Sequence, residues 1–175
     1  TPQAELTAIP FFANFELFEG YPLKFENLMQ GSIDGHTAAV FDLAYRNVGG
    51  RGGGGTTTSR QTMYVIESTR LNLPEFYLRP EGLMERVLNT IDRVDIDFAE
   101  RPGFSGKFML YGKDENAIRR LFTTPKLDFF EKNSNICVFG RGNYLFLYQS
   151  RTPAPPAQIQ QNLMFLSFLH DLFGQ

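Results

Sequence analysis

The chain has 175 residues, of which 42% are hydrophobic and 21% charged, and its formal net charge is −2. This length and composition are typical of one globular domain with its own core. The charge leaves no basic excess for phosphate contacts, which argues against nucleic-acid binding. One cysteine and two histidines are too few for an internal disulfide or a structural zinc site, and we expect no cofactor.

Phenylalanine dominates the aromatic residues, with 18 Phe and no Trp. Because a Phe ring has no polar atom that needs a partner, we expect most of these rings to fill a large, dry core. The single cysteine, Cys137, lies in an apolar run and is expected to be buried and inert. No apolar run approaches the ~20 residues that a membrane-spanning helix needs.

The first part of the chain is typical of strands joined in hairpins. Residues 15–18, 23–33 and 36–47 are expected to be extended, and Asp34-Gly35 is a strong signal for a two-residue turn between the last two. Apolar residues occupy both faces of the 36–47 strand. We therefore expect both sides of the sheet to be partly covered.

A glycine run follows, with six glycines among residues 49–55. It formally matches a dinucleotide-binding fingerprint, but a Thr-rich segment and a strand follow it instead of a helix, so no helix N-terminus is available to hold a phosphate. We predict a flexible hairpin tip at 49–59, and a returning strand over 60–71 that Leu73-Pro74 ends.

The second part of the chain mixes helices and strands. Pro80 is typical of a first helical turn, and an apolar stripe over 83–91 predicts the helix that follows. Asp114 is expected to cap one helix, and Thr124-Pro125 to begin another. The other expected elements are extended segments at 94–98 and 107–111, a hairpin of 136–139 with 144–148, a Pro-rich spacer at 152–156 and a last helix over about 157–173.

This order of elements predicts a single α+β domain over residues 1–175. Its largely antiparallel sheet is built from hairpins, and three or four helices cover it, including the C-terminal apolar helix. From Leu163 onward that helix is apolar nearly all round, so it is either buried or docked on something.

The Phe-rich ends of the chain leave two interpretations open. Phe11, Phe12, Phe15 and Phe18 near the start could pack with the last helix into the core. If both ends stay exposed, they would mark a protein partner, a membrane surface or a homodimer contact.

The densest acidic cluster comprises Asp92, Asp95, Asp97 and Glu100. On a strand, Asp95 and Asp97 project from the same face, where two carboxylates could hold a hard divalent cation or work as an acid–base pair. Two arginines flank the cluster, which favours a solvated strand edge with local ion pairs. Asp95 and Asp97 are thus weak metal candidates, and we assign no catalytic or cofactor-binding residue.

Neither His36 nor His170 has a Ser or Cys neighbour in a recognisable nucleophile setting, and no Gly-x-Ser-x-Gly elbow occurs. A triad can assemble from distant residues, so a missing motif does not disprove one. The enzyme class therefore stays open, although the sequence favours a protein that is not an enzyme.

The middle of the chain, roughly residues 30–150, resembles an uncharacterised bacterial family, a domain of unknown function. The residues that carry the resemblance are Gly31-x-x-x-Gly35, Val40-Phe41-Asp42-Leu43-x-Tyr45, Leu73-Pro74-x-Phe76-x-Leu78-Arg79-Pro80-Glu81, Asp95-Ile96-Asp97-Phe98, Pro102-x-Phe104-Ser105-x-x-Phe108, Gly112-x-Asp114-Glu115 and Leu121-Phe122.

Members of that family often carry membrane-spanning helices before this domain. The resemblance therefore implies a domain tethered to the cytoplasmic face of a bacterial membrane, which fits a chain that begins at Thr1 and not at Met. Without such an anchor we expect a cytoplasmic protein. The family has no established activity, so no catalytic residue carries over.

Three functions follow from these observations. The leading hypothesis is a non-catalytic binding or assembly domain of a membrane-tethered bacterial protein. The alternative is a metal-dependent or hydrolytic enzyme that uses the Asp92–Glu100 cluster in a polar cleft. The third is a carrier of a small ligand in a Phe-lined cavity.

Overall fold

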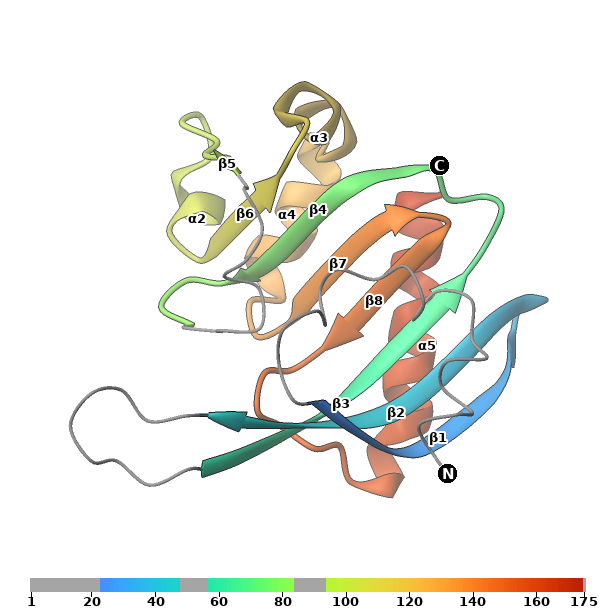
Figure 1. The fold of residues 1–175 in the computed structure, drawn as a ribbon. Helices are drawn as coiled ribbons and strands as arrows, with labels where there is room; N and C mark the ends of the chain where they lie inside the picture. The colour runs from blue at the N-terminus through green and yellow to red at the C-terminus, as the bar shows by residue number, and fades with distance from the viewer. Residues whose placement is uncertain (1–22, 48–56, 84–93, 175) are drawn as a thin grey trace.

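A computed structural model describes residues 23–47, 57–83 and 94–174 (Figure 1). The described residues form an eight-stranded sheet in which every neighbouring pair is antiparallel, in the order β1-β2-β3-β8-β7-β4-β6-β5. The strands are β1 (Leu23–Ile33), β2 (His36–Asn47), β3 (Thr57–Glu67), β4 (Leu73–Pro80), β5 (Val94–Asp95), β6 (Phe108–Gly112), β7 (Cys137–Gly142) and β8 (Tyr144–Tyr148).

Four helices occur in the described ranges, and the α+β class predicted from the sequence is confirmed. They are α2 (Pro102–Ser105), α3 (Glu115–Leu121), α4 (Thr124–Lys132) and α5 (Pro156–Phe173). In Figure 1, α5 crosses one face of the sheet behind β3 and β8, and α4 lies behind β4 and β7. No helix in the described part of the chain is long and apolar enough to cross a membrane.

The strand pairs of the three predicted hairpins are present, β1 with β2, β2 with β3 and β7 with β8. Asp34 and Gly35 take positive φ angles of 50° and 82° at the β1–β2 turn, where Ile33 pairs with His36. Two successive residues with positive φ define the tight turn that suits the right-handed twist of paired strands. The β7–β8 hairpin turns at Gly142, whose φ is also positive at 56°.

Strand β4 corrects two predictions. Leu73-Pro74 was expected to end a strand, but it begins β4, and Pro80 ends this strand instead of opening a helix. A proline inside a sheet removes one ladder hydrogen bond. The β4–β7 register shifts between Leu73 and Phe76, and this irregularity accommodates Pro74. Pro80 is the last residue of its strand, a position that tolerates proline.

Some predictions fall on residues that the structure does not describe. These are the strand at 15–18, the helix beyond Leu83 and most of the hairpin tip at 49–59. Thr57–Ser59 are described, and they belong to β3. The segment between β2 and β3 is therefore shorter than predicted.

Two hydrophobic clusters lie on opposite faces of the sheet. Along β3, Tyr64 and Ile66 belong to the cluster beneath the helices, whereas Met63 and Val65 belong to the other. This alternation is the period of two that separates the faces of a strand. Both faces of the central strands are buried, as their apolar composition predicted.

The cluster beneath the helices is dominated by aromatic rings, which confirms the expected Phe core. Its buried phenylalanines are Phe76, Phe98, Phe104, Phe108, Phe122, Phe130 and Phe173. Burying one such ring contributes roughly 1.5–3 kcal/mol. Cys137 is also buried, in the opposite cluster.

Candidate functional site

The outer face of α5 exposes large apolar side chains. Met164 is 68% exposed and Phe168 is 49% exposed, one helical turn apart. The inner face of the same helix buries Leu166, Leu169 and Phe173 against the sheet. The helix is therefore apolar on both sides, as the sequence predicted, but only one side has a place in the core.

Helix α4 extends this exposed surface. The half-buried Phe129 ring lies 5.1 Å from the Phe168 ring and 5.8 Å from the Phe165 ring, measured between centroids. The Phe165 and Phe168 rings are near parallel, 6.4 Å apart. We call these three rings together with Met164 the α4–α5 surface.

Little charge lies on α5. Its only ionised residue at neutral pH is Asp171, near its C-terminal end, and it has no Lys or Arg. On α4, Lys126 is buried with its ammonium group 5.5 Å from the centre of the Phe173 ring, and burial lowers its pKa. The α4–α5 surface therefore offers a partner methionine and aromatic contacts with few charges to desolvate.

A second cluster gathers where the β1–β2 turn and the turn after β3 meet α5. The Nε2 atom of His170 lies 2.8 Å from the Ser68 hydroxyl, and its Nδ1 atom lies 3.3 Å from the Asp171 carboxylate. The His36 ring lies 4.4 Å from the His170 ring. The sequence alone did not reveal that His170 contacts a serine, because Ser68 and His170 are 102 positions apart and no local motif marks Ser68.

The Ser68, His170 and Asp171 arrangement has the connectivity of a catalytic triad but not its access. Ser68 is 2% exposed and His170 is 1% exposed, so no substrate carbonyl can reach the hydroxyl. Burial lowers the pKa of His170, and the neighbouring His36 lowers it further. The cluster therefore satisfies buried polar groups and does not present a nucleophile.

The acidic cluster keeps the predicted alternation. Asp95 and Asp97 are exposed, while Ile96 and Phe98, which alternate with them, are buried. Burial raises the pKa of Asp95, with a smaller contribution from the charge of Asp97. Within the described ranges, no three His, Cys, Asp or Glu side chains gather closely enough to hold a metal. Asp92 lies outside those ranges.

The flanking arginine has a different role from the one predicted. Arg101 forms ion pairs with Asp128 and Glu131 of α4, the latter at 3.2 Å, whereas the other flanking arginine, Arg93, lies outside the described residues. Arg101 thereby ties α2 to α4. The hypothesis of an enzyme or a metal site at Asp95 and Asp97 stays a prediction.

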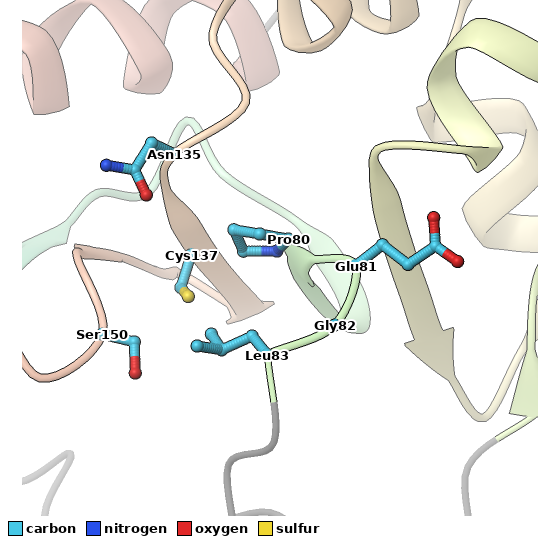
Figure 2. Close-up of a pocket in the computed structure, with 7 residues that line it drawn as sticks. All are labelled: Pro80, Glu81, Gly82, Leu83, Asn135, Cys137 and Ser150. Carbon is cyan, nitrogen blue, oxygen red and sulfur yellow. The ribbon is translucent and has the colours of Figure 1, made fainter.

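A pocket of about 260 Å³ lies where β4 ends beside β7 and the loop after β8 (Figure 2). The sulfur of Cys137 and the side chain of Leu83 face it. The Ser150 hydroxyl, which is buried, has no hydrogen-bond partner among the described residues. The lining residues are Pro80, Glu81, Gly82, Leu83, Asn135, Cys137 and Ser150.

This pocket fits neither alternative function. It contains no Phe, so it is not the Phe-lined cavity that a ligand carrier would need, and it contains neither Asp95 nor Asp97. The aromatic rings on the helical side pack against one another, with Phe76, Phe122 and Phe173 within 5.1–5.7 Å between centroids.

Comparison with known proteins bears on the fold. No family model and no curated protein matches this chain. Among solved structures, it is similar to the mycobacterial trehalose monomycolate transport factor A, TtfA, with a TM-score of 0.61 and 17% identity. The match covers 86% of this chain and 73% of that one. At this identity the likeness establishes a shared α+β fold.

Proposed function

We propose that this domain is a non-catalytic binding or assembly domain whose α4–α5 surface docks an apolar helix face of a protein partner. The observation that carries the proposal is the exposure of Met164 and Phe168 on a helix whose opposite side is already buried. Soluble proteins rarely expose contiguous apolar surface without a partner for it.

The charges on α5 favour a protein over a membrane surface. Helices that lie in a membrane interface carry Lys and Arg on their polar face, which attract anionic lipids. Helix α5 carries neither, so it offers such lipids no cation of its own. Methionine, aromatic rings and few charges are instead typical of the core of a protein interface.

The structural comparison supports the same kind of role. The neighbour that shares the fold is, by its name, a transport factor. We therefore propose a role in transport for this domain as well. The tether to a bacterial membrane, with this domain on the cytoplasmic side, is a further part of the proposal that rests on the family resemblance. The sequence of the full-length gene product tests this tether, because it shows whether membrane-spanning helices are present.

Site-specific photocrosslinking in the native host tests the docking surface. A benzophenone amino acid at Phe168 should give one discrete crosslinked protein, whereas the same group at the exposed Gln158 should not, because Gln158 lies off the Met164–Phe168 stripe. The crosslinked protein is then purified and titrated with the domain. M164E/F168E should weaken binding by at least about tenfold, since it places two charges in an apolar contact, and Q158E should leave binding unchanged.

Three results would overturn the proposal. One is equal crosslinking from both positions, and another is unaltered affinity in M164E/F168E. The third is flotation of the domain with phosphatidylglycerol–phosphatidylethanolamine vesicles in a manner that M164E/F168E abolishes, which would assign the surface to a membrane. Sedimentation equilibrium of the isolated domain shows whether the partner is a second copy of this chain or a different protein.

A further inference from the structure

The β1–β2 turn is attached to α5 by two neighbouring contacts. The Ser167 hydroxyl donates a hydrogen bond to the Asp34 carboxylate. One helical turn along, the half-buried His36 ring packs on the His170 ring at 4.4 Å between centroids, with the planes inclined by 45°. At this separation, a positive charge on one imidazole disfavours a positive charge on the other.

The neutral form of His170 satisfies both polar groups that face its ring nitrogens. Its Nδ1 atom faces the Asp171 carboxylate and its Nε2 atom faces the Ser68 hydroxyl, so a ring that donates through Nδ1 and accepts at Nε2 satisfies both groups. The Ser68 oxygen also accepts a hydrogen bond from the backbone N–H of Arg70 at 3.2 Å. The Arg70 guanidinium pairs with Asp171 at 3.2 Å, which places one more positive charge beside the ring.

We propose that His36 and His170 form an acid-sensitive latch, which holds the β1–β2 turn on α5 at neutral pH and loosens it when the pair takes up protons. A proton on His170 puts a charge in a site that is 1% exposed. Asp171 offsets that charge only in part, because Arg70 already shares its carboxylate. The turn is the movable member, since α5 is fixed by its buried face.

The latch borders the proposed docking surface. Ser167, which bonds the turn, directly precedes Phe168 in the helix, so release of the turn would change one edge of the α4–α5 surface. The latch nevertheless rests on the two histidines and their contacts alone. Its test therefore does not depend on whether the α4–α5 surface binds a partner.

The direction of the pH effect follows from the environment of His170. Burial lowers its pKa, the charges of His36 and Arg70 lower it further, and Asp171 opposes them. A folded-state pKa below the unfolded value of about 6.5 means that the unfolded or released chain binds the proton better. The contact is therefore fully stable above about pH 6.5, and it weakens as the pH falls through that value.

Hydrogen exchange measured by mass spectrometry on the intact domain tests the latch. After correction for the intrinsic pH dependence of exchange, amides around Ile33–His36 should exchange about tenfold faster at about pH 5.5 than at about pH 7.5. Amides of β4 and β6 should not change. H170Q should abolish this acid effect, because an amide side chain can donate and accept as the neutral ring does but does not titrate.

H36Q provides a second variant that keeps His170 and removes the neighbouring charge. It should reduce the acid effect without abolishing it. The proposal fails if the turn keeps the same protection at both pH values in the unmodified domain. It also fails if β4 and β6 lose protection in parallel with the turn, or if H36Q and H170Q both retain the full acid effect.

Discussion

Phe104 and Phe168 show how much the surroundings of one residue type decide its role. Phe104 is 1% exposed, stacks on Phe108 and meets Phe98 edge-on, each at 5.6 Å between centroids. Phe168 has aromatic neighbours as well, but half of its surface faces solvent. Sequence analysis expected most Phe rings to lie in the core, but it could not separate buried rings such as Phe104 from the exposed ring of Phe168.

Substitution of these two rings should separate stability from binding. We expect Phe104→Ala to lower the free energy of unfolding by about 3–5 kcal/mol, because the cavity left behind adds to the lost burial. Phe168→Ala should change stability by less than about 1 kcal/mol, since its ring is already half in water. Urea denaturation followed by far-ultraviolet circular dichroism measures both. A similar cost for the two variants would contradict the assigned roles.

At the scale of the element, α3 shows how local sequence sets a helix boundary. The Asp114 carboxylate accepts a hydrogen bond from the backbone N–H of Ala117 at 2.9 Å, which confirms the predicted cap. The same carboxylate sits at the positive end of the helix. This short helix buries Ile118 against the core and therefore depends on a well-defined start.

Removing that cap should weaken the domain by a predictable amount. Asp114→Ala should lower the free energy of unfolding by about 1 kcal/mol, because it leaves the backbone N–H of Ala117 in the first turn without a hydrogen-bond partner. Asp114→Asn should retain most of the stability, since an amide oxygen accepts the same bond. Thermal unfolding measures the difference. Equal losses for both variants would show that the charge, and not the hydrogen bond, holds the helix start.

At the scale of the whole molecule, the sheet joins two cores. Strand β3 contributes Tyr64 and Ile66 to one cluster and Met63 and Val65 to the other, so the two cores share this strand. On the second face, the hydroxyl groups of Tyr77 and Tyr148 lie 2.8 Å apart and link β4 to β8. The cores are therefore coupled through shared strands.

We expect this coupling to make unfolding of the described domain a single cooperative transition. The chain has no Trp, so fluorescence reports on the packing around its seven tyrosines, Tyr77 and Tyr148 among them, and far-ultraviolet circular dichroism reports on the secondary structure. The two signals should share one midpoint in urea. Separate midpoints would show that the two faces of the sheet unfold independently.

Sequence reasoning succeeded where the signal is local and failed where it is not. Asp34-Gly35 predicted a turn because few residues tolerate two positive φ angles in succession. Pro80 misled because proline suits both a first helical turn and the last residue of a strand, and only the pairing of Pro80 with Phe108 decides between them. The candidate sites were harder still, because the sequence singled out Asp95 and Asp97 by proximity along the chain alone.

The amino-acid sequence by itself determined the class of fold, the main hairpins, the helix cap at Asp114 and the Phe-rich core, because each depends on residues within a few positions of one another or on composition. Only the tertiary structure decided that α5 keeps Met164 and Phe168 outside, and that His36, Ser68 and His170 meet. Which face of an apolar helix is covered, and which distant side chains touch, depends on how the strands are ordered in the sheet, and that order is a property of the whole chain.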